Sequence, residues 1–205
     1  MNERRSSAIG RPRDASKDQA VLKAARRLLA EVGYQQTTIA AISRRSGVNS
    51  PAIYRRWATR EALIAEAVHG PGGHPLPNES GDLKEDLKAW VQVFLVRAAR
   101  PAARVGVPGL LSDSQTEESR SRLVAIGSPV RQAFSKMIGG AVGRGEIAAD
   151  IDTSFLFDLL ADSTSMRGLR CGLDDSDAYI ESLSEALYFL ATRSNGAVDV
   201  GVVRR

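Results

Sequence analysis

Apolar residues recur at intervals of three and four along most of the chain, and this spacing restricts the fold more than any other feature. Such a pattern marks one face of an α-helix, and no segment alternates strictly enough to predict a β-strand. We therefore predict an all-α fold. The expected helices cover, approximately, residues 16–32, 37–46, 50–57, 60–68, 83–100, 102–112, 116–143, 153–170 and 176–193.

A loop rich in Gly and Pro, residues 70–77, separates the short predicted helices from the longer ones, and we place a domain boundary there. Before the loop we expect a flexible basic arm over 1–15 and a three-helix helix-turn-helix domain over 16–69, with a fourth helix at its end. After the loop we expect a helical bundle over 78–195 and a disordered tail over 196–205.

The segment from Thr37 to Arg60 has the dimensions of a helix-turn-helix. Two helices flank a tight turn at Gly47, and Asn49 is placed to cap the second helix. In such units the second helix enters the major groove of DNA while the first crosses the backbone. Basic and hydroxyl-bearing side chains above an apolar underside make this segment our candidate DNA-binding site. The alternative is a helical hairpin with a solvated basic face.

Charge is distributed unevenly along the chain. Residues 1–60 carry a net charge of +9, whereas residues 61–205 carry −5. This asymmetry is expected when one end of a protein meets a polyanion. The only cysteine is Cys171, which excludes an internal disulfide framework and a multi-cysteine zinc site. The chain has only two histidines, so a His-rich metal centre is excluded as well. We expect neither a metal nor a cofactor.

No segment is predicted to enter a membrane. The first thirty residues are charged and lack the apolar core of a signal peptide. The longest apolar stretch, residues 89–96, is too short to span a bilayer. We therefore expect a soluble, cytoplasmic protein.

A set of residues in the helix-turn-helix segment has a specific spacing. Its members are Gly33, Tyr34, Thr37, Thr38, Ile39, Ile42, Gly47, Val48, Asn49, Ser50, Ile53, Tyr54, Arg55, Arg56, Trp57, Arg60 and Leu63. This pattern resembles the TetR family of bacterial transcriptional regulators over about residues 16–69. The resemblance implies a homodimer that binds a palindromic operator in double-stranded DNA, usually as a repressor. It also implies release by a small-molecule ligand held in the C-terminal domain.

The resemblance also implies which side chains face DNA. Those placed to face bases are Ser50, Pro51, Ala52 and Arg55. Those placed to contact phosphates are Thr38, Tyr54, Arg56 and Arg60. Thr37 and Asn49 complete the predicted site, because each stands at a helix N-terminus where a phosphate could sit.

The basic arm contains a second candidate for DNA contact. Its sequence Gly10-Arg11-Pro12-Arg13 resembles the core of an AT-hook. Arginines on a flexible strand suit a narrow, electronegative minor groove. We predict that Arg11 and Arg13 add affinity for DNA, the alternative being a basic tail that makes no DNA contact.

The C-terminal half contains candidates for a dimer interface and for a ligand cavity. Apolar stripes on 153–170 and 176–193 suit either core or an interface of four helices, and the resemblance favours the interface. The interface candidates are Leu159, Ser163, Leu183, Leu187 and Leu190. The cavity candidates, which core packing would explain equally well, are Trp90, Phe94, Met137, Phe155 and Met166.

Two other classes of function compete with a sequence-specific regulator. An enzyme is not supported, because the sequence has no nucleophile elbow, phosphate loop, dinucleotide fingerprint or pair of metal ligands. A non-specific architectural DNA-binding protein would share the basic N-terminal end. It would not need the large, acidic C-terminal domain, and it would bind scrambled DNA as well as a selected site.

Overall fold

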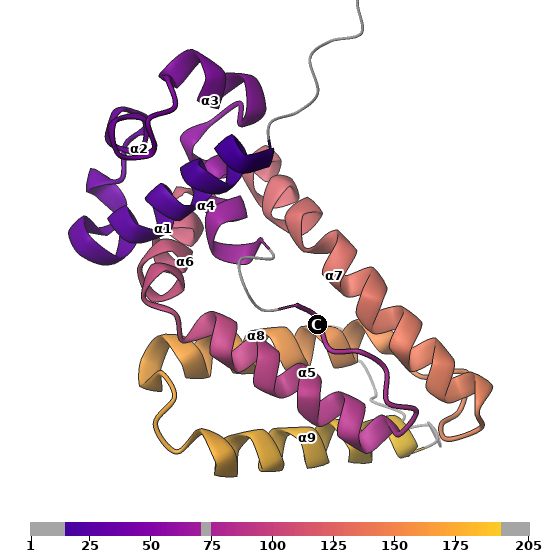
Figure 1. Ribbon diagram of the computed structural model, residues 1–205. Coiled ribbons are helices and arrows are strands. Elements are labelled where there is room, and N and C mark those ends of the chain that lie inside the picture. The colour runs from indigo at the N-terminus through magenta and orange to yellow at the C-terminus, as the bar shows by residue number, and fades with distance from the viewer. Residues whose placement is uncertain (1–14, 71–74, 194–205) are drawn as a thin grey trace, which may run out of the picture.

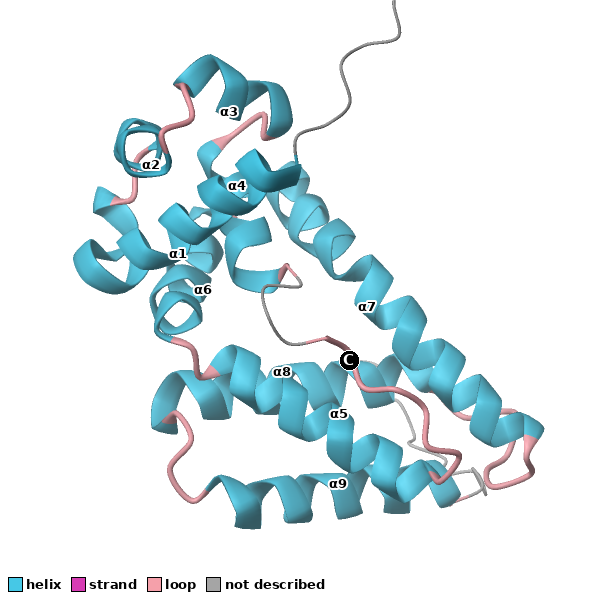
Figure 2. Cartoon of the chain, viewed as in Figure 1, coloured by secondary structure: helices cyan, strands magenta, loops and turns pink. Residues whose placement is uncertain are grey.

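The computed structural model describes residues 15–70 and 75–193, and every regular element within these ranges is a helix (Figures 1 and 2). The predicted all-α fold is therefore confirmed. The helices are α1 (Ala15–Gln36), α2 (Ile39–Ser46), α3 (Ser50–Arg56), α4 (Arg60–His69), α5 (Leu83–Ala98), α6 (Pro101–Asp113), α7 (Glu117–Gly143), α8 (Thr153–Cys171) and α9 (Ser176–Thr192). The proposed DNA contacts of Arg11 and Arg13, and the predicted tail, lie outside the described residues.

Side-chain caps fix the ends of the short helices at the N-terminal end. The oxygens of Thr38, Asn49 and Thr59 accept hydrogen bonds from backbone N–H groups three residues later, at 3.2, 2.9 and 3.1 Å. They cap α2, α3 and α4. Gly47 ends α2 with φ at 72°, a left-handed conformation that glycine adopts at little cost. The predicted turn between α2 and α3 is thus present.

Helix α1 differs from its predicted range at its C-terminal end. We expected it to stop at Gly33, but helical residues continue to Gln36 after a kink. Gly33 forms the kink with φ at 84° and ψ at 176°. The short segment after it turns the side chain of Tyr34 into the interior, where that residue is buried.

The C-terminal helices form a bundle around α5, which packs against both α8 and α9 (Figure 1). The core between them contains a cluster of aromatic rings. Trp90 meets Phe134 edge-on at 5.2 Å between ring centroids, and Phe157 contacts both Phe134 and Phe94. Helix α7 continues through Pro129 as one helix.

Helix α6 joins the two parts of the molecule, because it packs against α1 and α4 of the N-terminal part and also contacts α5 and α8 of the bundle (Figure 1). Leu29, Tyr34 and Ile64 from the N-terminal helices share a hydrophobic cluster with Ala103 and Leu110 of α6. None of the helices in the described ranges is long and apolar enough to cross a membrane.

Candidate functional site

Helices α2 and α3 form one end of the molecule (Figure 1). Helix α3 presents a polar face outward there and an apolar face inward. Ile53 and Trp57 are buried beneath it. The exposed face carries the side chains of Tyr54 and Arg55, and Pro51 is exposed at the N-terminal end of the helix. Most of the predicted DNA-contacting residues are therefore brought together on one surface.

The remaining members of this face sit at the start of α2 and α3. Thr38 and Asn49 are exposed, and each uses its side-chain oxygen to cap a helix. Ser50 and Ala52 are half-buried on the first turn of α3. The resulting surface has two capped helix N-termini, hydroxyl groups and the exposed Arg55, and such groups can donate hydrogen bonds to phosphates and base edges.

Helix α3 is anchored to its neighbours by a hydrogen bond and two ion pairs. The indole N–H of Trp57 donates to the Glu66 carboxylate on α4, at 2.7 Å. Arg56 lies between two carboxylates, 3.3 Å from Glu66 and 3.2 Å from Asp18 on α1. The predicted phosphate contact of Arg56 therefore competes with a structural role, because these ion pairs fix α3 relative to α1 and α4.

Thr37 and Arg60 lie in the interior rather than on this surface. Thr37 is fully buried, and its hydroxyl donates to the carbonyl of Gly33 at 2.7 Å. Its predicted phosphate contact is therefore wrong, because no polar atom of its side chain reaches solvent. The Arg60 guanidinium is largely covered; it donates to the carbonyls of Thr37 and Tyr34 and stacks over the Tyr34 ring at 4.3 Å.

Tyr34 also connects the helix-turn-helix to α6. Its hydroxyl donates to Asp113 at 2.6 Å, and burial together with this carboxylate raises the pKa of the phenol. The hydroxyl therefore stays protonated and able to donate. Gly109 lies directly against the ring, because a Cβ there would come within 2.3 Å of it. Helices α1, α4 and α6 are thus held together around one tyrosine.

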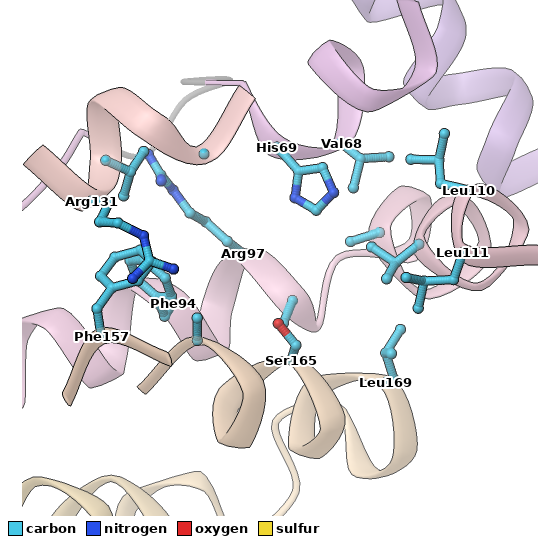
Figure 3. A pocket seen from close by; sticks show the side chains of 16 residues that line it. Val68, His69, Phe94, Arg97, Leu110, Leu111, Arg131, Phe157, Ser165 and Leu169 are labelled. Atoms are coloured by element: carbon cyan, nitrogen blue, oxygen red, sulfur yellow. The ribbon is translucent and has the colours of Figure 1, made fainter. Parts of the chain in front are cut away.

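A partly open cavity of about 360 Å³ lies beside this junction, lined by residues of α4 to α8 (Figure 3). Val68 and His69 at the end of α4 form part of its wall. Most of the other lining side chains are apolar, among them Leu110, Leu111 and Phe157. The size and lining are those of a site for a small organic ligand.

Only Phe94 of the five predicted cavity residues lines this cavity. Trp90 and Met137 are buried in the core instead, whereas Phe155 and Met166 are exposed on α8. The structure places these four away from this cavity, because helical spacing shows only that a residue belongs to an apolar face. It does not show whether that face meets core, cavity or solvent.

Sequence reasoning missed Arg97 and Arg131, which line the cavity, and it gave His69 no such role. One signal for Arg97 was present: it follows Phe94 by three residues, so a cation lies on the apolar face of a predicted helix. Burial removes water from the guanidinium and lowers the pKa of Arg97. Desolvation also lowers the pKa of His69, so the imidazole is mainly neutral at pH 7.

A separate apolar face runs along α8 and α9. Phe155, Met166 and Phe189 expose about half of their surface each, and Leu190 more than a third. Three predicted interface residues, Leu159, Ser163 and Leu183, are half-buried on the same two helices. Leu187 is fully buried in the core, so its prediction as an interface residue is wrong.

The described residues contain no group of three or more His, Cys, Asp or Glu side chains able to hold a metal ion. His74 lies outside the described ranges. Cys171 is half-buried at the C-terminal end of α8 as a free thiol.

The fold and the α2–α3 surface define an all-helical protein with an N-terminal helix-turn-helix domain and a C-terminal helical domain. Residues 21–67 match the model of the bacterial regulatory proteins of the tetR family, and residues 77–187 match that of the tetracyclin repressor-like C-terminal domain. The chain belongs to the TetR family of DNA-binding transcriptional regulators, which are not enzymes.

Relatives and solved structures agree with this assignment. The uncharacterized HTH-type transcriptional regulator YdeS of Bacillus subtilis is 26% identical, and the match covers 86% of this chain and 90% of YdeS. The DNA-binding transcriptional repressor TetR of Mycobacteroides abscessus is 25% identical over 88% of this chain and 96% of its own length. The TetR family regulator SCO0332 has a similar structure, with a TM-score of 0.68, 25% identity and coverage of 85% and 97%.

One further structure shares the fold. The regulator FadR from Bacillus subtilis, solved in complex with stearoyl-CoA, superposes with a TM-score of 0.60 and 18% identity. The match covers 85% of this chain and 97% of FadR.

Proposed function

We propose that the protein is a cytoplasmic, homodimeric repressor that binds a palindromic operator and leaves it when a small molecule occupies the cavity. The observation that carries this proposal is the position of α4. One side of α4 fixes the recognition helix α3 through Glu66, and its end forms the cavity wall at Val68 and His69. The repressor from Mycobacteroides abscessus and the ligand-bound FadR are relatives or neighbours consistent with it.

In the proposed complex, α3 lies in the major groove. Ser50, Pro51, Ala52 and Arg55 are its base-facing residues, and Thr38 and Tyr54 contact phosphates. Arg56 and Arg60 position the helix instead, because carboxylates and backbone carbonyls already engage their guanidinium groups. Asn49 caps α3, and Arg11 and Arg13 of the arm enter the adjacent minor groove.

The ligand would act through the spacing of the two recognition helices. Two half-sites on one face of DNA lie about 34–36 Å apart, so both α3 helices must keep that separation. A ligand that favours a different position of α4 therefore favours a dimer with the wrong separation. Operator affinity then falls by the coupling free energy between cavity and α3.

Tyr54 and Arg55 provide a matched test of the proposed DNA surface, since they are adjacent and both exposed. Tyr54→Phe removes a phosphate contact, and we expect affinity to fall by roughly 1 kcal/mol for all DNA sequences alike. Arg55→Ala removes a base contact, and we expect a loss of roughly 1–3 kcal/mol that depends on one base pair. The measurement is the affinity of each variant for a panel of single-base operator variants. A uniform loss in Arg55→Ala would show instead that this residue contacts the DNA backbone.

The apolar face of α8 and α9 is the proposed dimer interface. Introducing charges there, as Phe155→Lys with Phe189→Lys, should make the protein monomeric at micromolar concentration, because four ammonium groups, two from each protomer, would be desolvated without partners. Sedimentation velocity measures the change. The control is Val32→Lys, since Val32 is an equally exposed apolar residue on α1. A double variant that stays dimeric would refute this interface.

A further inference from the structure

We propose that the cavity takes an amphipathic anion, a molecule with an apolar body and one carboxylate-like headgroup, with the headgroup held by Arg97 and Arg131. This inference rests on the proposed function, because it names the class of ligand for the same cavity.

The charge of the lining selects for an anion. Among the described residues that line the cavity, two are arginines and none is Asp or Glu. Arginine keeps its charge under physiological conditions, whereas the nearby His69 is mainly neutral at pH 7. Against an apolar lining, an anion gains more from these two cations than it would in water. An anion would be attracted by both guanidinium groups, whereas a neutral ligand would not be and a cation would be repelled.

The polar and apolar parts of the lining lie at different ends. Figure 3 shows Arg97 and Arg131 with Phe94 and Phe157 on one side of the cavity. The Arg131 guanidinium lies 4.4 Å from the centre of the Phe157 ring. Phe157 contacts Phe94, which precedes Arg97 by about one turn of α5. This end therefore brings both cations to one aromatic cluster.

The opposite end of the cavity is apolar. Leu110 and Leu111 of α6 and Leu169 of α8 lie there in Figure 3. A ligand with its charge at the arginine end would bury its apolar part against these side chains. Each further methylene group would bury more apolar surface, so the affinity should grow with the length of the apolar body.

Arg131 has donors that a headgroup could use. Its Nη2 pairs with Asp158, and its Nη1 is 3.5 Å from the carbonyl oxygen of Ser154. A guanidinium carries five N–H donors and binds carboxylates with two parallel hydrogen bonds. Asp158 does not line the cavity, so a headgroup in the cavity would share Arg131 with it. Arg97 is half-buried and adds a second guanidinium to the lining.

The test uses three probes of equal length: decanoate, 1-decanol and decylammonium. Their binding to the full chain without DNA is measured by isothermal titration calorimetry at pH 7.5. We expect decanoate to bind at least tenfold more tightly than either of the other probes, and tetradecanoate more tightly than decanoate. Equal or tighter binding of the alcohol or the amine overturns the proposal, and so does a failure of both carboxylates to bind.

Variants assign the headgroup to the two arginines. Arg97→Met with Arg131→Met should weaken decanoate binding at least tenfold and leave 1-decanol binding unchanged. Lys136→Met is the control, because it removes an exposed cation from the same helix as Arg131 without touching the cavity. Should the double variant fail to fold, the single variants Arg97→Lys and Arg131→Lys keep the charge but lose the planar fork, and should each weaken decanoate selectively. Unchanged discrimination between the probes in these variants overturns the assignment.

Operator binding without any probe separates this inference from the proposed function. If the protein binds a specific operator but does not prefer decanoate, only the proposed ligand class is refuted. If the protein prefers decanoate but has no specific DNA site, only the proposed repressor function is refuted.

Discussion

Trp57→Ala is expected to destabilise the protein by about 3–5 kcal/mol, the range for truncating a buried aromatic side chain to alanine. Trp57 is 3% exposed and packs with Ile53 and Leu63 in the core of the helix-turn-helix. It is also the C-cap of α3, and its indole N–H bonds to Glu66. Truncation therefore removes apolar burial and the anchor of the recognition helix together, so specific DNA binding should be lost as well.

Urea unfolding at a fixed protein concentration measures this change, since the stability of a dimer depends on concentration. Trp57→Phe is the matched variant. It keeps an aromatic ring in the core and removes only the indole donor, which should cost about 1–2 kcal/mol. The account is contradicted if Trp57→Ala retains wild-type stability, or if both variants lose stability equally.

Gly168→Ala is expected to destabilise the C-terminal bundle by about 1–3 kcal/mol, the usual cost of overpacking. A Cβ at Gly168 on α8 would lie 2.6 Å from the Cβ of Ala98 and 2.8 Å from the backbone nitrogen of Ala99. Backbone cannot rotate away as a flexible side chain can. Helices α5 and α8 must therefore move apart, which also opens the core that both helices share.

Gly139→Ala is the control for this substitution. Gly139 also lies inside a helix, α7, and a Cβ there would have no atom within 4 Å. The same change should stabilise the protein by about 0.5–1 kcal/mol, because alanine is the better helix former. Thermal unfolding of both variants measures the two changes in stability, which should have opposite signs. Destabilisation by Gly139→Ala, or none by Gly168→Ala, would show that helix contact at Gly168 does not decide the result.

The helix-turn-helix could be predicted in detail because its signals are local. Asn49, Thr38 and Gly47 act on backbone groups within a few residues, and the structure has the caps and the turn at these positions. The sequence did not show which of the two adjacent threonines caps α2. The structure has Thr38 as the cap and Thr37 in the interior. A kink at Gly33 then places the Thr37 hydroxyl against a carbonyl four residues earlier.

The cavity and the apolar face of α8 and α9 could be predicted only in part, because both depend on how distant helices meet. Leu187 and Leu190 are three residues apart on one apolar stripe of α9, yet the first is in the core and the second is exposed. Helical spacing cannot order such residues by burial. The cavity wall likewise combines residues as distant as Val68 and Leu169, which only the packed structure brings together.

Selection of binding sites from a randomised duplex pool tests the central claim most directly. The affinity of the selected site and of a scrambled control is then measured at two salt concentrations. We predict a palindromic site bound at least about 10³-fold more tightly than the control. Similar affinity for both duplexes, with a steep dependence on salt, would contradict the account and indicate an architectural protein that contacts only phosphates.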